Sequence, residues 1–161
     1  MKFMMTILGL IVFAGQAAAL SCMRPDPIAT FNQVAAAPEP YFVLYGRLHF
    51  DESALPQGLK DPQSPDPAAI AAEFVGMTLT SAGFVRPYES PVELLPVCAG
   101  PWCGSARTDV DAIYFVRADK VPVMAIAEPC GGMIFANPSP EVLDALTVCM
   151  QGGACLPQPL Q

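Results

Sequence analysis

Six cysteines constrain the fold of this chain more than any other feature of its sequence. All six follow a segment that has the pattern of an export signal, and export delivers a protein to an oxidising compartment. An even number of cysteines in such a protein predicts structural disulfides rather than redox or metal chemistry. The cysteines are Cys22, Cys98, Cys103, Cys130, Cys149 and Cys155.

Residues 1–19 are predicted to be a cleavable signal peptide. Lys2 supplies the short positive region, residues 3–14 form an apolar run, and residues 17–19 are alanines of the kind that signal peptidase recognises. The apolar run is much shorter than the ~20 residues that are needed to cross a bilayer. No transmembrane anchor is therefore expected after cleavage.

The end of the signal peptide is left open by the sequence. Cleavage after Ala19 leaves residues 20–161, which are enough for a single domain. Cleavage after Ser21 would instead place Cys22 at the N-terminus. A lipoprotein signal would attach lipid to Cys22, but such signals normally have leucine where this chain has Ala19. The expected location is periplasmic or extracellular, with a lipid-anchored protein as the alternative.

The chain is acidic, and its charges argue against some classes of partner. It has 15 acidic and 8 basic residues, which give a formal net charge of −7 at pH 7. The basic residues are scattered, so no cluster can neutralise a row of phosphates. Nucleic acid and anionic membrane surfaces are therefore poor partners. The apolar residues beyond the leader are sufficient for a core, so most of the chain is expected to fold.

The remaining pattern predicts a helix, five or six strands and a second helix. Asp26 followed by Pro27 marks the start of the first helix, and Ser139 followed by Pro140 marks the start of the last. Residues 51–67 are rich in proline and acidic residues and are expected to form a mobile, solvated insertion. Short strands separated by prolines and glycines favour a small barrel or sandwich. Strands are predicted at residues 41–50, 74–80, 92–97, 113–116, 121–127 and 133–135.

Apolar alternation within residues 74–80 places Val75, Met77 and Leu79 on one face of a strand. The methionines beyond the leader are dispersed along the chain. They are therefore expected to fill the core rather than to bind copper. These methionines are Met23, Met77, Met124, Met133 and Met150.

Several short motifs give the chain a resemblance to a known family. The Cys-Met-Arg-Pro segment at residues 22–25, the short helix and a first strand carrying Gly46 resemble the opening of netrin-like modules. That group includes the N-terminal domain of tissue inhibitors of metalloproteinases and many exported bacterial proteins. Trp102-Cys103-Gly104 and Pro129-Cys130-Gly131 look like the family's mid-barrel and late cysteine motifs. The resemblance implies an OB-like Greek-key barrel of about five strands with helices at its side.

One departure limits what the resemblance implies about activity. The inhibitors begin with Cys-x-Cys, and the amine and carbonyl of the first cysteine chelate the zinc of the protease. Ser21 stands where that cysteine would be, and the expected mature N-terminus is Leu20. Inhibition of metalloproteases is therefore not expected of this chain.

Six cysteines allow 15 pairings, and their spacing favours one set. Two pairs are separated by only four and five residues, so each can close a local loop. Local pairing of both would leave one long-range bridge, which the family resemblance also suggests. The sequence does not fix the connectivity. The favoured set is Cys98–Cys103, Cys149–Cys155 and Cys22–Cys130.

No residues in the sequence form a recognisable catalytic or metal-binding set. His49 is the single histidine, which excludes sites built from several histidines, and it is expected at the surface. Ser105 lacks the Gly-x-Ser-x-Gly setting of a hydrolase nucleophile. Asp109 and Asp111 would need further oxygen ligands to bind calcium, so a solvated turn is favoured. Trp102 is the candidate contact residue, with packing against the neighbouring disulfide as the alternative.

These observations predict an exported, disulfide-stabilised barrel with a non-enzymatic binding role in the cell envelope. Its partner is expected to be a protein or another envelope component, and no cofactor or metal is expected. Two alternatives stay open. One is an envelope scaffold that is lipid-anchored through Cys22. The other is an enzyme of unrecognised type, because paired carboxylates in a pocket leave no sequence motif.

Overall fold

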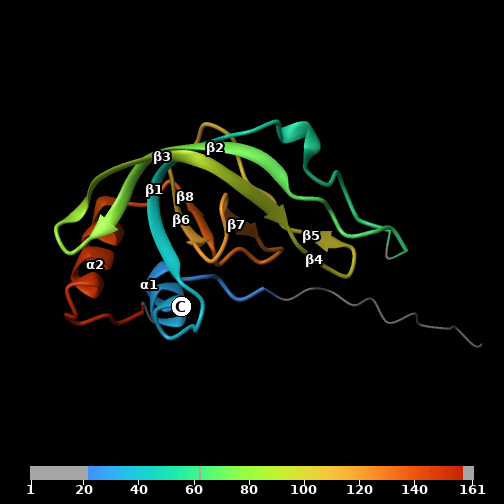
Figure 1. Cartoon of the computed structure of the whole chain (residues 1–161). Helices are drawn as coiled ribbons and strands as arrows, with labels where there is room; N and C mark the ends of the chain where they lie inside the picture. The colour runs from blue at the N-terminus through green and yellow to red at the C-terminus, as the bar shows by residue number, and fades with distance from the viewer. Residues whose placement is uncertain (1–21, 62, 158–161) are drawn as a thin grey trace, which may run out of the picture.

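The computed structural model describes residues 22–61 and 63–157, so the predicted signal peptide lies outside the described residues. Figure 1 shows the two helices, the strands and the segments that connect them. The helices are α1 (Pro27–Ala35) and α2 (Pro140–Met150), with a short 3₁₀ helix at Glu52–Ala54. The strands are β1 (Tyr41–His49), β2 (Ile70–Thr80), β3 (Gly83–Pro96), β4 (Cys98–Ala99), β5 (Trp102–Cys103), β6 (Ala112–Arg117), β7 (Val123–Ala127) and β8 (Ile134–Ala136).

Five of the strands close into a barrel. β1 pairs with β2, β2 with β3, β3 with β7 and β7 with β6, and β6 returns to pair with β1. β3 and β7 run parallel, the other neighbours run antiparallel, and β8 adds to β6. The chain is therefore mainly β, and the prediction of an OB-like Greek-key barrel with two flanking helices is confirmed.

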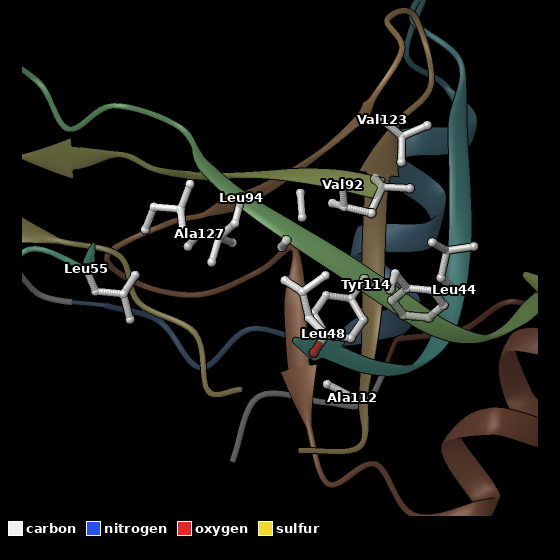
Figure 2. Close-up of a cluster of buried hydrophobic side chains, with 14 residues drawn as sticks. Leu44, Leu48, Leu55, Val92, Leu94, Ala112, Tyr114, Val123 and Ala127 are labelled. Atoms are coloured by element: carbon white, nitrogen blue, oxygen red, sulfur yellow. The ribbon is translucent and has the colours of Figure 1, made fainter. Parts of the chain in front are cut away.

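The barrel interior is filled by side chains that alternate along each strand. Leu44 and Leu48 of β1, Phe74 of β2, Leu94 of β3 and Tyr114 of β6 point inward and are buried. Figure 2 shows how Leu44, Leu48, Leu94 and Tyr114 gather between the strands. The rings of Phe74 and Tyr114 meet edge-on, with their centroids 5.6 Å apart. These inward residues determine which residues of the same strands face outward.

β1 and β2 approach each other closely at two glycines. Gly46 and Gly76 lie opposite each other, and a Cβ atom on either would stand 2.3 Å from a carbonyl oxygen of the other strand. The ring of Phe74 lies 2.9 Å and 2.8 Å from these two Cβ positions. Glycine at both positions therefore lets β1 continue from its pairing with β6 into its pairing with β2.

A second apolar cluster joins both helices to the outside of the barrel. Ile28 and Val34 of α1 and Leu146 of α2 pack with Val43 of β1 and Leu79 of β2, and all five are buried. In Figure 1 the two helices lie together at one end of the molecule. Neither of these helices is long and apolar enough to cross a membrane, within the part of the chain that the structure describes.

Both predicted helix starts are correct, but one of the caps differs. Asp26 accepts hydrogen bonds from the N–H groups of Ile28 and Ala29, at 2.8 Å and 2.9 Å. Ser139 precedes α2, yet its side chain makes no hydrogen bond that caps the helix. It is hydrogen-bonded to the side chain of Glu141 instead, which lowers the pKa of that carboxyl group.

Three disulfides are present, and the described residues include no free cysteine. The long-range bridge joins residues that are 108 positions apart and ties the segment before α1 to the segment between β7 and β8. Beside it, the Thr30 hydroxyl donates a hydrogen bond to the Gly132 carbonyl oxygen at 2.7 Å. The pairs are the set that the spacing favoured: Cys22–Cys130, Cys98–Cys103 and Cys149–Cys155.

β3 is the largest departure from the predicted elements. The sequence predicts a strand at residues 92–97, whereas β3 begins at Gly83 and includes Pro87 and Pro91. β3 pairs with β7 only from Val92 onward. In its first half β3 is paired with β2 on one side and is not paired with β7 on the other. Prolines are tolerated at such an edge, where no second strand needs their missing N–H groups.

The predicted insertion at residues 51–67 is more structured than expected. It contains the Glu52–Ala54 3₁₀ helix, and Leu55 is buried in the barrel core. The N–H of Lys60 donates a hydrogen bond to the carbonyl oxygen of Pro101 at 2.8 Å. The Glu52 carboxylate also accepts a hydrogen bond from the N–H of Thr108 at 2.7 Å. The segment is therefore attached to the rest of the molecule through Glu52, Leu55 and Lys60, and its mobility stays a prediction.

Tyr114 should give the barrel a measurable alkaline sensitivity. Burial raises the pKa of Tyr114 from 10.0 to about 12. The unfolded chain releases this proton near pH 10 while the folded chain holds it, so stability is intact below pH 10 and falls as the pH approaches 12. Urea denaturation should show a loss of about 2 kcal/mol between pH 9 and pH 11.5 from this group. The Tyr114→Phe variant should lose less, and an equal loss would contradict this role of Tyr114.

Candidate interaction surface

Three strands present an outer face that the helices leave uncovered. β1, β2 and β3 lie side by side, and the residues that do not point into the barrel alternate with those that do. The register aligns these outward residues across the strands. The aligned rows are Tyr45–Met77–Pro87, Arg47–Val75–Glu89 and His49–Glu73–Pro91. We call these nine residues the β1–β3 outer face.

The apolar part of this face continues from the cluster under the helices. Leu79 is buried in that cluster, whereas Val75 and Met77 on the same side of β2 are 45% and 38% exposed. Tyr45 connects the two regions because its ring packs edge-on against Phe84 of the cluster, with the centroids 5.8 Å apart. The outer face therefore extends the helix-covered apolar surface into solvent.

Both basic side chains of the outer face already have acidic partners. Arg47 donates two hydrogen bonds to the carboxylate of Asp111, at 2.9 Å and 3.0 Å. This hydrogen-bonded pair raises the pKa of Arg47 and lowers the pKa of Asp111. The Nδ1 atom of His49 contacts the carboxylate of Asp109, whose backbone lies in the left-handed region at φ 58°. The positive charge of Arg47 is therefore balanced by Asp111, and the His49 ring already contacts Asp109.

Three carboxylates on the same side of the sheet are left without such partners. Glu73 and Glu89 belong to the outer face. Glu93 is the outward residue of β3 that follows Pro91. None of the three forms an ion pair within residues 22–61 and 63–157. Glu89 lies directly opposite Val75 in the ladder. The face thus combines exposed apolar side chains with a net negative charge.

The polar residues singled out in the sequence lie on this face (His49) or beside it (Asp109 and Asp111) and form no metal site. His49 is at the surface, as expected, and Asp109 and Asp111 are engaged with His49 and Arg47. Across the described residues, no group of three or more histidine, cysteine or acidic side chains is arranged to hold a metal ion. The two aspartates therefore fix the basic side chains of β1.

Trp102 lies elsewhere, on the small β4–β5 ribbon at the opposite end of the molecule from α2 (Figure 1). It is partly buried and pairs with Ala99 next to the Cys98–Cys103 bridge. The ribbon is held tightly to the end of β7, because a Cβ atom on Gly104 would stand 2.0 Å from the carbonyl oxygen of Ala127. The role of Trp102 as a contact residue stays a prediction.

A shallow hollow lies in the segment between β1 and β2. Lys60 lines it, and the Nζ atom of this lysine is 3.2 Å from the carboxylate of Asp66. The hollow is wide open, and its one lysine is paired with an acid. It therefore offers less to a partner than the outer face does.

The sequence did not reveal that the outer face is exposed. Val75, Met77 and Leu79 share one side of β2, as predicted, but only Leu79 is buried. The expectation that the methionines fill the core is wrong for three of them. Phe74 could have indicated that Val75 is exposed. Its large ring fills the barrel interior, and the next residue of a strand faces the opposite side. The exposed methionines are Met23, Met77 and Met150.

The comparisons with known proteins found no match to this chain. No family model matches the chain, and no curated protein or solved structure matches it significantly. The resemblance to netrin-like modules therefore stays a prediction that rests on the sequence motifs.

Proposed function

We propose that this protein is an exported, non-enzymatic binding module of the cell envelope that contacts a protein partner through the β1–β3 outer face. One observation carries the proposal: Tyr45, Met77 and Val75 continue the apolar cluster onto an exposed sheet surface. Contiguous exposed apolar surface on a folded domain marks interaction sites. The rigid barrel holds this surface in place, because Gly46, Gly76 and the inward residues fix the register of its strands.

Export is supported by the leader pattern at residues 1–19 and by the three disulfides, which persist in oxidising compartments. Intact-mass measurement of protein recovered from the periplasm or the medium should show a chain that begins at Leu20. The mass should be lower by six hydrogen atoms than that of the reduced chain. A retained leader, or free thiols under non-reducing conditions, would contradict the proposed export.

A netrin-like relationship is part of the proposal. It is supported by the five-stranded barrel and by the Cys22–Cys130 bridge, both of which the resemblance implies. Zinc-directed protease inhibition is left out of the proposal. With Leu20 as the first residue, the nitrogen of Cys22 lies within a peptide bond and supplies no free amine for chelation.

The lipid-anchored alternative is incompatible with the Cys22–Cys130 disulfide. Lipid would be attached to the sulfur atom of Cys22, and that atom is bonded to the sulfur atom of Cys130. One sulfur atom cannot carry both bonds, so the proposal takes the disulfide-linked form without lipid. Radiolabelled palmitate should therefore not be incorporated, and labelling at Cys22 would favour the anchored form.

Photo-cross-linking in intact cells tests the contact surface. A photoreactive phenylalanine analogue replaces Met77 on the outer face, and the same analogue replaces the exposed Asp144 of α2 as a control. We expect irradiation to give a discrete protein adduct at position 77 and no adduct of that mass at position 144. The same adduct at both positions, or none at position 77, would overturn the proposed surface.

A further inference from the structure

We infer that the partner docks on the β1–β3 outer face with a cationic and apolar polypeptide segment, in which lysine or arginine side chains lie beside apolar ones. This inference rests on the proposed function and adds the chemistry of the partner. It follows from the juxtaposition of exposed Val75 and Met77 with Glu73 and Glu89 on one face.

The apolar residues of the face define what the partner must bury. Met77 lies between Tyr45 and Pro87 in one row, and Val75 lies next to it in the following row. A partner that covers them removes their exposed side chains from water, which favours apolar contacts from the partner. Met77 is flexible and adapts to the shape of such contacts.

The charges around these residues define the sign of the partner. Arg47 is held by Asp111 and His49 by Asp109, so neither basic group is free to meet an acidic partner. Glu73, Glu89 and Glu93 have no ion pair among the described residues and lie on the same side of β2 and β3. The net charge of −7 adds a long-range attraction for cations. Charge complementarity therefore selects lysine or arginine beside the apolar contacts.

The edge of β3 favours docking on the face rather than addition of a strand. A peptide that extended the sheet would pair with the first half of β3, which β7 does not reach. Pro87 and Pro91 lie in that half and have no N–H groups to donate. The side chains of the face therefore offer a partner more than the edge of β3 does.

Two other occupants are disfavoured by the same charges. A second copy of this chain, docked through the same face, would bring Glu73 and Glu89 of both copies together. An anionic membrane surface would be repelled by these carboxylates and by the net charge of the chain. A basic and apolar polypeptide meets neither repulsion.

Labelled octapeptides test the inference. The probes are a fluorescein-labelled alternating Lys-Val peptide, a Glu-Val peptide and a Lys-Ser peptide, each titrated with the disulfide-linked protein and followed by fluorescence anisotropy. We expect the Lys-Val peptide to bind at least about tenfold more tightly than the other two at low salt. Its affinity should fall as the salt concentration rises, because surface charges are screened. No binding of the Lys-Val peptide, or equal binding of all three, would overturn the inference.

Two variants with the same change in net charge locate the binding surface. Glu73→Gln with Glu89→Gln removes two carboxylates from the outer face, and Glu39→Gln with Asp144→Asn removes two exposed carboxylates elsewhere. The outer-face variant should bind the Lys-Val peptide about tenfold more weakly, and the control variant should bind within about twofold of the parent. Equal weakening in both variants would mean that net charge alone attracts the peptide, and would overturn the inference. Self-association or binding to anionic vesicles that depends on Met77 would also overturn it.

The peptide and cross-linking experiments fail in different ways. A protein adduct at position 77 without discrimination among the peptides would leave the proposed function in place and refute the cationic partner. Peptide discrimination without an adduct in cells would show a face of the inferred chemistry and would overturn the proposed function.

Discussion

Replacing both Cys22 and Cys130 with serine should lower the free energy of unfolding by about 5 kcal/mol. This bridge joins residues that are 108 positions apart, so its loss releases the most chain entropy in the unfolded state. Domains of this size have a total stability of roughly 5–15 kcal/mol. The double variant should therefore be partly or wholly unfolded, as measured by urea denaturation followed by circular dichroism.

The matched control replaces Cys98 and Cys103 with serine. It removes the same atoms from a bridge whose residues are only 5 positions apart, so the expected loss is about 2 kcal/mol. Equal losses in the two double variants, or a larger loss for the short bridge, would refute the long bridge as the main covalent constraint.

The second large effect is expected at Phe74, where substitution by alanine should cost about 3–5 kcal/mol. The ring is 1% exposed and packs against Tyr114 and Tyr88, with centroid distances of 5.6 Å and 6.0 Å. Its removal leaves a cavity in the barrel that the closed strands cannot fill. Thermal and urea denaturation measure the loss.

Val75→Ala is the matched control for Phe74, because Val75 is the next residue of β2 and faces outward. Its substitution should change the free energy of unfolding by about 0.5 kcal/mol or less. If Val75→Ala costs as much as Phe74→Ala, the inward and outward faces of β2 are assigned wrongly, and the outer face is not a surface.

Local chemistry made both helices predictable from the sequence. Asp26-Pro27 and Ser139-Pro140 mark the helix starts, because proline suits the first helical position whatever the rest of the fold does. The hydrogen bonds of Ser139 could not be predicted in the same way. Its hydroxyl can interact with a backbone N–H of the helix or with the nearby carboxylate of Glu141. Which of the two it contacts depends on side-chain geometry.

The first half of β3 could not be read from the sequence because strand edges are set by tertiary pairing. Pro87 and Pro91 argue against a strand in general, yet both are compatible with an edge that only β2 pairs. The start of β2 was missed for a similar reason. Ile70 and Ala72 become strand residues through their pairing with β3 and burial in the core.

The sequence predicts which residues share the outer face but not that this face is exposed. Alternation places Val75 and Met77 together, but it does not say whether a given apolar face meets the core, a helix or water. That depends on how far α2 reaches along the sheet, which is a property of the whole fold. The ion pair that neutralises Arg47 could not be predicted either, because Arg47 and Asp111 are 64 positions apart and meet only in the folded chain.

Methionine oxidation in living cells can decide whether the outer face is covered by a partner. Met77 and Met150 are 38% and 42% exposed, so hydrogen peroxide should convert both to the sulfoxide at similar rates in the purified protein. In intact cells, mass spectrometry should show Met77 oxidised several times more slowly than in the purified protein, with Met150 unchanged. Equal oxidation of the two methionines in cells would contradict the claim that the β1–β3 outer face binds a partner.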